Sequence, residues 1–518
     1  MKYRRWRIVL KNRQQKEKEK TQCSGLTFSL DENAEKLQET FNYPCNQDLS
    51  VRPFTISAFD RKAILYFVNG MSDSQLIEKE LLPQLISPFP NQNKEDHLNL
   101  DFFANSVPIK DIKEDCQFNS IVSNLLMGDS VLLVDGEDKA YLFGTASFEK
   151  RGVEKSEDEA VLKGPKEAFI ESIAVNISLV RKQLRSTELV TEYVTVGDKG
   201  LSKVALMYLN DVANPNLLEK IKKRLKQIKS DEVQNLGLLE QHIEERPYSL
   251  VPTVLYTERP DRAVSFINEG HIVLLMDSSP SSLVLPVTFW SFFHTSEDYY
   301  SRWPYGNFTR FLRLMAIFIT IMTPATYIAV TNYHIEMLPT DLVLAISSTR
   351  EEVPFPAIFE VIMLLIAFEL IREGGVRVPS PIGPTIGIVG ALILGQAAVE
   401  ANIISPILVI VIAITGLASF AIPNLSFSYM IRLSTYIFLL FGSLWGFLGI
   451  GICITMCIGY LTTLTSFDVP FLSPMAPHYP SSKDLVIRPP IWKQWLRPLN
   501  VFPLEEEKMK KPKGENSE

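Results

Sequence analysis

Residues 303–470 are poor in charge, and this stretch most constrains how the chain can fold. The chain of 518 residues has 52 Lys and Arg and 59 Asp and Glu, but this stretch holds only fifteen of them and no lysine. A charge at the centre of a bilayer costs about 2.5–3.5 kcal/mol on insertion scales, so lipid-facing segments are recognised by such depletion. The sequence therefore predicts an integral membrane protein with a large soluble region ahead of its transmembrane helices.

Apolar and amphipathic runs alternate through the first three hundred residues, which predicts an α/β or α+β region. The predicted strands are residues 63–68, 130–134, 139–148, 189–196 and 203–209, and the second and third of these are expected to form a hairpin. Residues 216–230 predict a basic amphipathic helix. Its lysines are interpreted as a solvated face rather than a nucleic-acid patch, because one apolar face is available for the core.

Composition divides the chain into five parts, with a polar, acidic boundary near 151–159. The predicted parts are a basic flexible arm at 1–30, a first soluble subdomain at 31–155, a second at 156–300, a transmembrane helical domain at 301–470 and a cytoplasmic polar tail at 471–518. The arm lacks the apolar core of about 7–15 residues that a signal peptide needs. We therefore expect the soluble region to face the cytoplasm, and the arm either to be solvated or to touch anionic lipid headgroups.

Residue patterns for catalysis, cofactors and metals are missing from the sequence. It contains no phosphate-binding glycine loop, no paired histidine ligands and no nucleophile elbow. The five cysteines show no metal-ligand spacing. We therefore assign no catalytic, cofactor-binding or metal-binding residue and do not expect an enzyme.

Four apolar stretches predict full membrane spans, at 314–330, 382–398, 403–422 and 433–464. The last is longer than a hydrocarbon core of roughly 30 Å, and one tilted or protruding helix fits it better than two. A fifth stretch at 355–371 is expected to be interfacial or packed within the bundle. The prediction is thus a bundle of four or five helices, with the tail inside for four spans and outside for five.

Acidic residues within these stretches are candidates for function, because charges in a membrane are costly to keep. Glu360 and Glu400 could line an ion path or contact another subunit if the chain oligomerises, since a ring of carboxylates favours cations. Gln396 lies one helical turn before Glu400 and would extend a polar stripe. The alternative is that each acid caps a loop or pairs with an arginine, which is the interpretation preferred for Glu369.

Glycines form two candidate helix-packing seams, because small residues let helices approach closely in a membrane. Gly383, Gly387 and Gly390 form the first seam, and Gly442 and Gly446 belong to the second.

Motifs spread over residues 120 to 480 resemble those of the A subunit of GerA-family spore germination receptors. The motifs are GPKEAFIES at 164–172, TERPD at 257–261, LPVTF at 285–289, VPFPAIF at 353–359, ELIREG at 369–374, PSPIGPTIGIVGALILGQAAVEANIISP at 379–406 and LSP at 472–474. The motif residues singled out in the soluble region are Gly164, Pro165, Glu167, Thr257, Glu258, Arg259, Pro260 and Asp261. One departure is Ser278, at a position where the family tends to have glycine after the aspartate, and it is expected to alter a turn.

This resemblance implies a membrane subunit of a nutrient receptor in the inner membrane of dormant bacterial spores, with its soluble region facing the spore core. Members of the family work with a B subunit similar to amino-acid transporters and a C subunit that is a lipoprotein. They are thought to oligomerise into a nutrient-gated channel. The alternatives are a secondary transporter, which the lack of an internal repeat in the membrane half disfavours, and a membrane-anchored ligand-binding scaffold.

Overall fold

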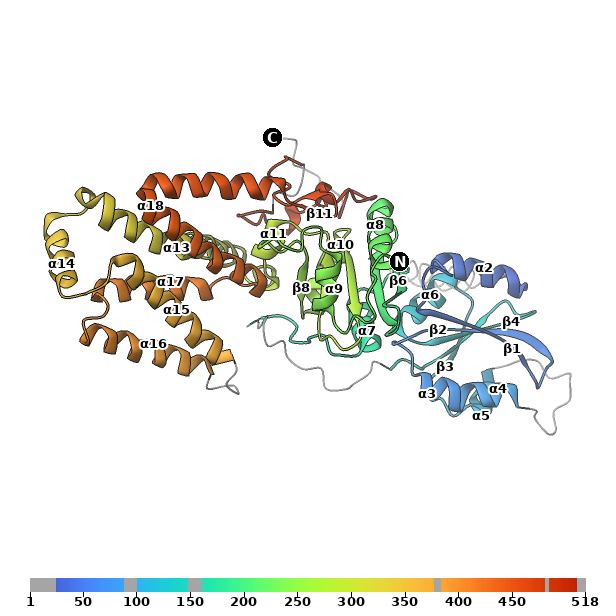
Figure 1. Cartoon of the computed structure of the whole chain (residues 1–518). Coiled ribbons are helices and arrows are strands. Elements are labelled where there is room, and N and C mark those ends of the chain that lie inside the picture. The colour runs from blue at the N-terminus through green and yellow to red at the C-terminus, as the bar shows by residue number, and fades with distance from the viewer. Residues whose placement is uncertain are drawn as a thin grey trace, which may run out of the picture.

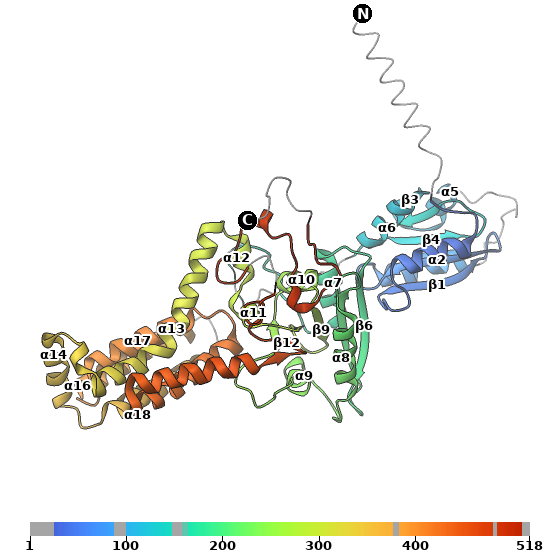
Figure 2. The ribbon, with the colours of Figure 1, turned by 90° about the horizontal axis from the view of Figure 1, so that it is seen from above.

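The computed structural model of the chain describes residues 25–87, 100–147, 159, 161, 163–376, 383–479 and 484–509. A first sheet lies at one end of an extended molecule, a second sheet in the middle and a helical bundle at the other end (Figure 1). Figure 2 shows the same succession from above. The arm predicted at 1–30 and the boundary predicted at 151–159 lie almost entirely outside the described residues.

The first sheet has five antiparallel strands in the order β1-β2-β4-β5-β3. They are β1 (Leu49–Ile56), β2 (Arg61–Val68), β3 (Ile112–Asp115), β4 (Ser130–Val134) and β5 (Ala140–Phe143). One face is covered by α2 (Leu30–Thr40) and α6 (Phe118–Met127), and the other by α3 (Ser74–Leu76), a π-helical turn (Ile77–Leu81), α4 (Leu82–Ile86) and α5 (Leu100–Ser106). The predicted strands at 63–68 and 130–134 are confirmed, and so is the hairpin of 130–134 with 139–148, although its second strand is shorter than predicted and ends at Phe143.

The second sheet also has five antiparallel strands, in the order β6-β7-β9-β10-β8. They are β6 (Leu189–Val196), β7 (Ser202–Leu209), β8 (Leu255–Thr257), β9 (Ile272–Met276) and β10 (Ser282–Leu285). Helices α7 (Ile173–Gln183) and α10 (Pro260–Asn268) pack on one face, and α8 (Pro215–Lys226) and α9 (Leu236–Ile243) on the other. The predicted basic helix is α8, which buries Leu217, Ile221 and Leu225.

The two sheets repeat one fold. In each, helices and strands follow one another in the same order, and the third strand in sequence lies at the edge beside the fifth. Gly128 to Gly136 (GDSVLLVDG) corresponds to Gly270 to Ser278 (GHIVLLMDS), and all four of these end residues have a positive φ. Ser278, with a φ of 62°, therefore occupies a left-handed turn position that favours glycine, which is the position Gly136 fills in the first repeat.

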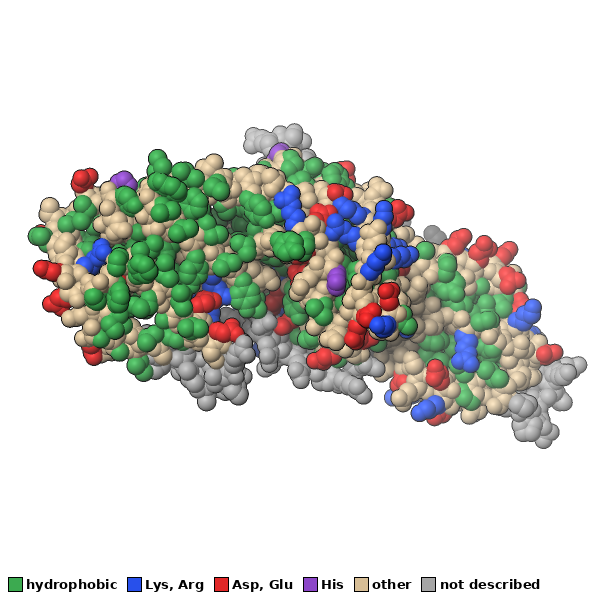
Figure 3. Space-filling view, viewed as in Figure 1, with side chains coloured by type: hydrophobic (Ala, Val, Ile, Leu, Met, Phe, Trp, Pro, Cys, Tyr) green, Lys and Arg blue, Asp and Glu red, His purple; other side chains and the backbone are tan. Residues whose placement is uncertain are grey.

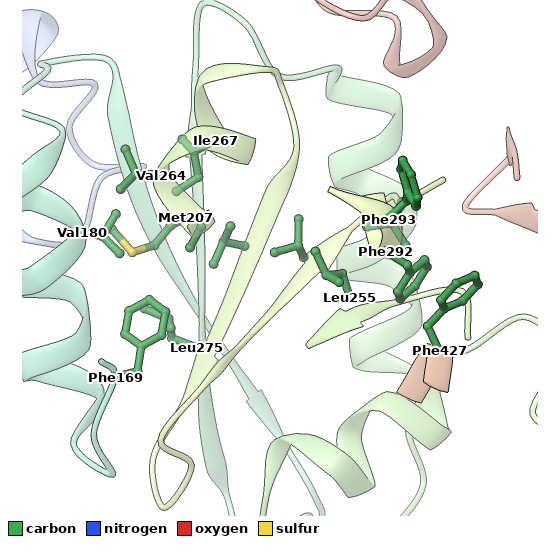
Figure 4. Packing of buried hydrophobic residues seen from close by; sticks show 14 of the residues in the cluster. Phe169, Val180, Met207, Leu255, Val264, Ile267, Leu275, Phe292, Phe293 and Phe427 are labelled. Carbon is green, nitrogen blue, oxygen red and sulfur yellow. The ribbon is translucent and has the colours of Figure 1, made fainter. Parts of the chain in front are cut away.

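The core of the second sheet continues into the helical bundle. Buried side chains of the sheet and of α7 and α10 form one cluster with Phe292 of α11 (Phe289–Phe293) and Phe427 of α18 (Leu425–Thr463). The Phe292 and Phe427 rings are stacked with their centroids 5.9 Å apart (Figure 4). Leu464 and Phe471, which follow α18, belong to the same cluster. The second sheet and the bundle therefore share one hydrophobic core.

The helices of the bundle are α13 (Trp303–Tyr333), α14 (Thr340–Glu351), α15 (Ala357–Val376), α16 (Gly383–Glu400), α17 (Pro406–Phe420) and α18. Within the described part of the chain, α13 and α18 are long and apolar enough to cross a bilayer, judged by length and composition alone. Hydrophobic side chains cover much of the visible bundle surface, whereas most charged ones gather on the two sheets (Figure 3). The four apolar stretches predicted between 314 and 422 coincide with α13, α15, α16 and α17. Helix α14 was not predicted. The number of membrane spans stays a prediction.

The last apolar run is not one continuous helix, so that prediction is wrong. Helix α18 is interrupted at Trp445 and Gly446, where the backbone leaves helical angles and Gly446 has a φ of 59°. The two arms, 425–444 and 447–463, fold back on one another so closely that a Cβ on Gly449 would collide with the first arm. Length alone could not reveal this break, because glycine makes a left-handed turn accessible at little cost within an otherwise apolar run.

Hydroxyl groups satisfy backbone carbonyls near two helix interruptions. Pro324, inside α13, provides no N–H for the Thr320 carbonyl, and Thr435 of α18 donates its hydroxyl to that oxygen at 3.2 Å. Tyr333 donates its hydroxyl to the carbonyls of residues 443 and 444, directly before the break in α18, at 2.7 and 2.9 Å. Unpaired buried backbone groups are costly, so these contacts stabilise α13 and α18 where the two helices pack together.

The tail packs against the second sheet. A short hairpin, β11 (Thr465–Ser466) and β12 (Val469–Pro470), follows α18. Val501 is buried in the cluster beneath α8 and α9, and the Leu504 N–H donates to the Val212 carbonyl at 2.9 Å. The described part of the tail therefore contributes to the folded core.

Candidate functional site

Ion pairs and hydrogen bonds concentrate where the second sheet meets the start of α13, a region that we call the junction. It comprises α12 (Ser296–Tyr300), the first turns of α13, the N-terminal end of α10 and residues 484–488 of the tail. Its charged and tyrosine side chains are Arg259, Asp261, Arg262, Asp298, Tyr299, Tyr300, Arg310, Arg313, Asp484 and Arg488.

Two of the sequence motifs meet at the junction. Arg259 donates to both carboxylate oxygens of Asp261, at 3.0 and 2.7 Å, and to the Pro165 carbonyl at 2.9 Å. The Tyr300 hydroxyl donates to Asp261 at 2.6 Å. The Tyr300 ring lies over Gly164, whose φ is 113° and where a Cβ would come within 2.5 Å of the ring. The motif residues are thus in contact with the helix that leads into α13.

Arg262 joins α10 to the segment before α13. It forms an ion pair with Glu159 and donates to the carbonyls of Ser291 and His294 at 2.8 and 3.0 Å. Thr257 donates its hydroxyl to the same glutamate at 2.5 Å. Arg262 therefore holds α11 at Ser291, and His294 directly after that helix, against α10.

Asp298 holds the first turns of α13. The Nε of Arg310 lies 3.0 Å from its Oδ2, and Arg313 donates to its two oxygens at 2.7 and 2.9 Å. Gly306 lets α13 approach, because a Cβ there would lie 2.8 Å from the Asp298 carbonyl oxygen. Arg310 and Asp298 are both buried, so their charges interact with little screening by solvent.

The tail completes the junction. Asp484 forms a second ion pair with Arg310, and Arg488 donates to the carbonyl of Asp298. Trp303 donates its indole N–H to the Arg488 carbonyl at 2.5 Å. Three parts of the chain that are distant in sequence are therefore tied together at the start of α13.

Burial and neighbouring charges shift several pKa values here. Burial alone would raise the pKa of Asp298, but the hydrogen bonds and charge of Arg313 hold it below its usual value. Burial, with a neighbouring guanidinium, lowers the pKa of His294 to about 4. Burial and the charge of Asp484, which accepts the Tyr299 hydroxyl at 2.5 Å, raise the pKa of Tyr299 well above its usual value. These groups therefore keep one protonation state around neutral pH.

The junction is suited to mechanical connection. Among the described residues, no group of three or more His, Cys, Asp or Glu side chains is placed to hold a metal ion. Removing one partner of a buried ion pair costs about 3–5 kcal/mol, because it leaves a buried charge uncompensated. Separating the second sheet or the tail from the start of α13 would therefore require these pairs to be broken.

The acids proposed for an ion path or a subunit contact have different surroundings. Glu360 is buried and accepts the N–H of Ser405, the N-cap of α17, at 3.0 Å. Gln396 donates to Glu400 at 3.0 Å, and both lie exposed on α16. Glu360 is therefore engaged within the chain, whereas the polar pair at 396 and 400 faces outward.

Glu369 forms the arginine pairs expected of it. It pairs with Arg432 and, at 3.8 Å, with Arg372. Arg372 also donates to the hydroxyl of Ser419 at 2.6 Å. This cluster links α15 to α17 and α18.

The candidate packing glycines lie on α16 and α18. Gly383 and Gly387 belong to α16, and Gly390 faces α15. Gly442 approaches α13, where a Cβ would lie 3.1 Å from a backbone carbonyl. Gly446 forms the break in α18.

The remaining motif residues have structural contacts. Glu167 pairs with Lys182 at 2.5 Å, and the Glu258 carbonyl accepts the N–H of Phe169 at 2.8 Å. Pro260 occupies the first turn of α10, where a missing N–H costs nothing.

Sequence reasoning missed Asp298, Arg310 and Asp484 as site residues. The signal for Arg310 was its position directly before a predicted span, where an arginine is usually solvated. Asp298 ends a capping box that begins at Thr295, which is a local signal for the start of a helix. Nothing local marks Asp484, because it lies beyond the helical bundle.

Comparison with known proteins identifies related chains. Residues 35–500 match the family described as Bacillus/Clostridium GerA spore germination protein. "Spore germination protein KA" of Bacillus subtilis (strain 168) is 34% identical over 476 residues, which cover 91% of this chain and 87% of that protein. "Spore germination protein A1" of the same organism is 38% identical over 371 residues, 71% of this chain and 77% of that protein. The crystal structure of the N-terminal domain of the A subunit of the Bacillus megaterium spore germinant receptor GerK3 aligns at 27% identity and a TM-score of 0.39, over 51% of this chain and 98% of that one.

Proposed function

Because the chain belongs to the GerA family of spore germination proteins, we propose that it is a membrane subunit of a nutrient receptor in the inner membrane of dormant spores. This proposal rests on one observation: the second sheet is joined to α13 by a shared hydrophobic core and by the ion pairs of the junction. A receptor subunit needs such a connection, since a signal received by one part must change the other. A bare membrane anchor would need no buried ion pairs at this position.

In this proposal six helical segments cross the membrane, rather than the four or five predicted from the sequence, because both arms of α18 and the helix α15 are counted. Successive segments run in opposite directions. Tyr333, at the end of α13, meets the break in α18, and Ile404, before α17, packs with the outer part of α13. Ile422, after α17, is back in the core of the second sheet. Six crossings leave the soluble region and the tail on one side, which we assign to the spore core.

The polar pair of Gln396 and Glu400 supports an oligomer. Both side chains are exposed on an otherwise apolar helix, where contact with lipid would be costly. Contact with water in a central path, or with another copy of the chain, would remove that cost. We therefore propose that copies of the chain oligomerise and pass ions beside Glu400 when nutrient is sensed, together with a transporter-like B subunit and a lipoprotein C subunit.

Reconstitution tests this proposal. The chain and its partner subunits are placed in liposomes, and cation flux is followed on addition of nutrient. We expect flux from the parent, reduced flux from Glu400→Gln, and unchanged flux from the exposed control Glu35→Gln on α2. A chain that runs as a monomer in mild detergent and passes no current would refute the channel and favour a ligand-binding scaffold.

A further inference from the structure

A cavity of about 180 Å³ lies beside the junction, between α10, α11, α12 and the tail. We call it the junction cavity. Among its lining residues are Arg262, Glu269, His271, Trp290, His294 and Asn500. It therefore lies where the tail closes over the second sheet, and an occupant would contact both.

Charged side chains in the lining are already paired. Glu269 bonds Lys508 at 3.4 Å, and Asp484 is paired with Arg310. Asp261, also in the lining, is paired with Arg259. An ionic occupant would have to break one of these pairs, so the lining favours an uncharged one.

Two buried polar atoms of lining residues have no hydrogen-bond partner among the described residues: Nε1 of Trp290 and Oδ1 of Asn500. Asn500 is buried, and its Nδ2 donates to the Ser473 hydroxyl at 3.0 Å, which leaves its carbonyl as a free acceptor. The indole N–H of Trp290 can only donate. Each of the two atoms has less than 1 Å² of accessible surface, so an occupant reaches it only when the side chain turns toward the cavity. An unpaired buried polar group costs about 1–3 kcal/mol, so an occupant that both accepts and donates would recover that energy on binding.

Two histidines in the lining add acceptors. Nδ1 of His271 bonds the Pro286 carbonyl at 2.6 Å, and Nε2 of His294 bonds the Leu485 carbonyl at 2.6 Å. In the neutral rings these bonded nitrogens carry the protons, so Nε2 of His271 and Nδ1 of His294 remain as acceptors. The lining thus offers one unpaired donor and several acceptors.

The cavity volume limits the size of an occupant. A protein cavity of about 150 Å³ holds benzene, which has six non-hydrogen atoms. The junction cavity would therefore hold a molecule of roughly six to eight such atoms.

We propose that the junction cavity binds a small uncharged molecule rich in hydroxyl or amide groups. It accepts a hydrogen bond from Trp290 and donates one to Asn500, and so links α11 to the tail. The meaning of this site for germination rests on the proposed function, because the bound molecule would strengthen the contact of the tail with α13. Binding itself can be measured without any germination or flux assay.

The test uses the purified full chain in detergent and saturation-transfer NMR. The probes are glycerol, an uncharged molecule with six non-hydrogen atoms, and lactate, an anion of the same atom count. We expect saturation transfer to glycerol and at least five-fold less to lactate. Trp290→Phe removes the donor and should reduce the glycerol signal at least five-fold, whereas the same substitution at the exposed Trp492 should leave it unchanged.

A second variant covers the case in which Trp290→Phe fails to fold. Ser265→Met places a longer side chain at the exposed rim of the cavity and should also reduce the glycerol signal at least five-fold. Equal signals for glycerol and lactate, or a glycerol signal that survives in the folded variants, would overturn the proposal. Glycerol binding without nutrient-triggered flux would refute the proposed function alone, and flux without binding would refute this site alone.

Discussion

The guanidinium of Arg310 and the carboxylate of Asp298 form an ion pair with 3.0 Å between Nε and Oδ2, and neither side chain is exposed by more than 1%. The pair joins the helix that enters the bundle to the segment that leaves the second sheet. Asp484 and Arg313 enlarge it to two arginines and two aspartates, so the charges balance. Separating buried ion pairs is costly, so this cluster stabilises the contact between the two segments.

We expect Arg310→Met to lower the free energy of unfolding by about 3–5 kcal/mol, because buried Asp298 loses one of its two arginines and Asp484 loses its ion-pair partner. The matched control is Arg302→Met, which removes an exposed arginine directly before α13 and should change the free energy by less than about 0.5 kcal/mol. Chemical denaturation of the detergent-solubilised chain measures both. Equal effects of the two substitutions would show that the buried ion pair contributes no more to the free energy of unfolding than an exposed arginine does.

Ser278→Gly should raise the free energy of unfolding by about 0.5–1 kcal/mol. Ser278 has a φ of 62°, a left-handed conformation that strains a residue with a Cβ. The reciprocal change Gly136→Ser, at the equivalent turn of the first repeat, should lower it by a similar amount. Changes of the same sign in both variants would contradict the equivalence of the two turns.

Local patterns were sufficient to predict three of the five strands of the first sheet (β2, β4 and β5) and two of the five of the second (β6 and β7). The run from Ser130 to Val134 followed by Asp135 and Gly136 contains both a strand and its turn, so its prediction needed only neighbouring residues. The departure at Ser278 was inferred instead from the family resemblance, and Ser278 does lie in a left-handed turn. The repetition of the whole fold was missed, although Gly128 to Gly136 and Gly270 to Ser278 carry it in the sequence.

Distant partners could not be predicted in this way. The surroundings of Arg310 depend on Asp298 before it and on Asp484 after the bundle, and no periodic pattern connects these positions. The prediction of one continuous helix over α18 failed for a different reason. Apolar composition records that a segment is buried or in lipid, but not where its direction reverses, and Gly446 was interpreted only as a packing residue.

Gly446→Ala tests that break. We expect it to destabilise the chain by about 1–3 kcal/mol, because Gly446 has a φ of 59° and a Cβ there would lie 3.1 Å from Tyr333 and His334 side-chain atoms. Gly451→Ala, in the second arm, has nothing within 4 Å of the added Cβ and should be neutral or slightly stabilising. Thermal unfolding in detergent compares the two. If Gly446→Ala matched Gly451→Ala, a continuous α18 would become the better description.

Glu360→Ala should destabilise the bundle by about 1–3 kcal/mol, because it leaves the N–H of Ser405 without its acceptor at the start of α17. Glu360→Gln keeps an acceptor oxygen and should lose less than half as much. Thermal unfolding of both variants, combined with the flux assay, separates a structural role from an ion path. Loss of flux in a fully stable Glu360→Gln would instead place this carboxylate in the path.

The pH dependence of stability tests the surroundings of Glu240 on α9. Burial, and then the charge of Glu244, raise the pKa of Glu240 to about 7 in the folded chain, above its ordinary value of 4.5. Between these values the folded state holds a proton that the unfolded state releases, so rising pH favours unfolding, and the penalty is complete above pH 7. Buried His271 acts in the opposite direction, because burial lowers its pKa to about 4 in the folded chain. The folded chain therefore loses stability as pH falls below about 6.5, the pKa of histidine in the unfolded chain.

Comparing a Glu240 variant with the parent isolates its contribution, because the histidine effect is common to both. We expect Glu240→Gln to be more stable than the parent by about 1–3 kcal/mol at pH 8, and to show little difference at pH 4.5. Glu219→Gln, an exposed glutamate on α8, should change nothing across this range. Denaturation midpoints at half-unit intervals from pH 4.5 to 8 measure the difference. A constant difference across that interval would mean that the Glu240 carboxyl titrates near its ordinary value and is solvated in the folded chain.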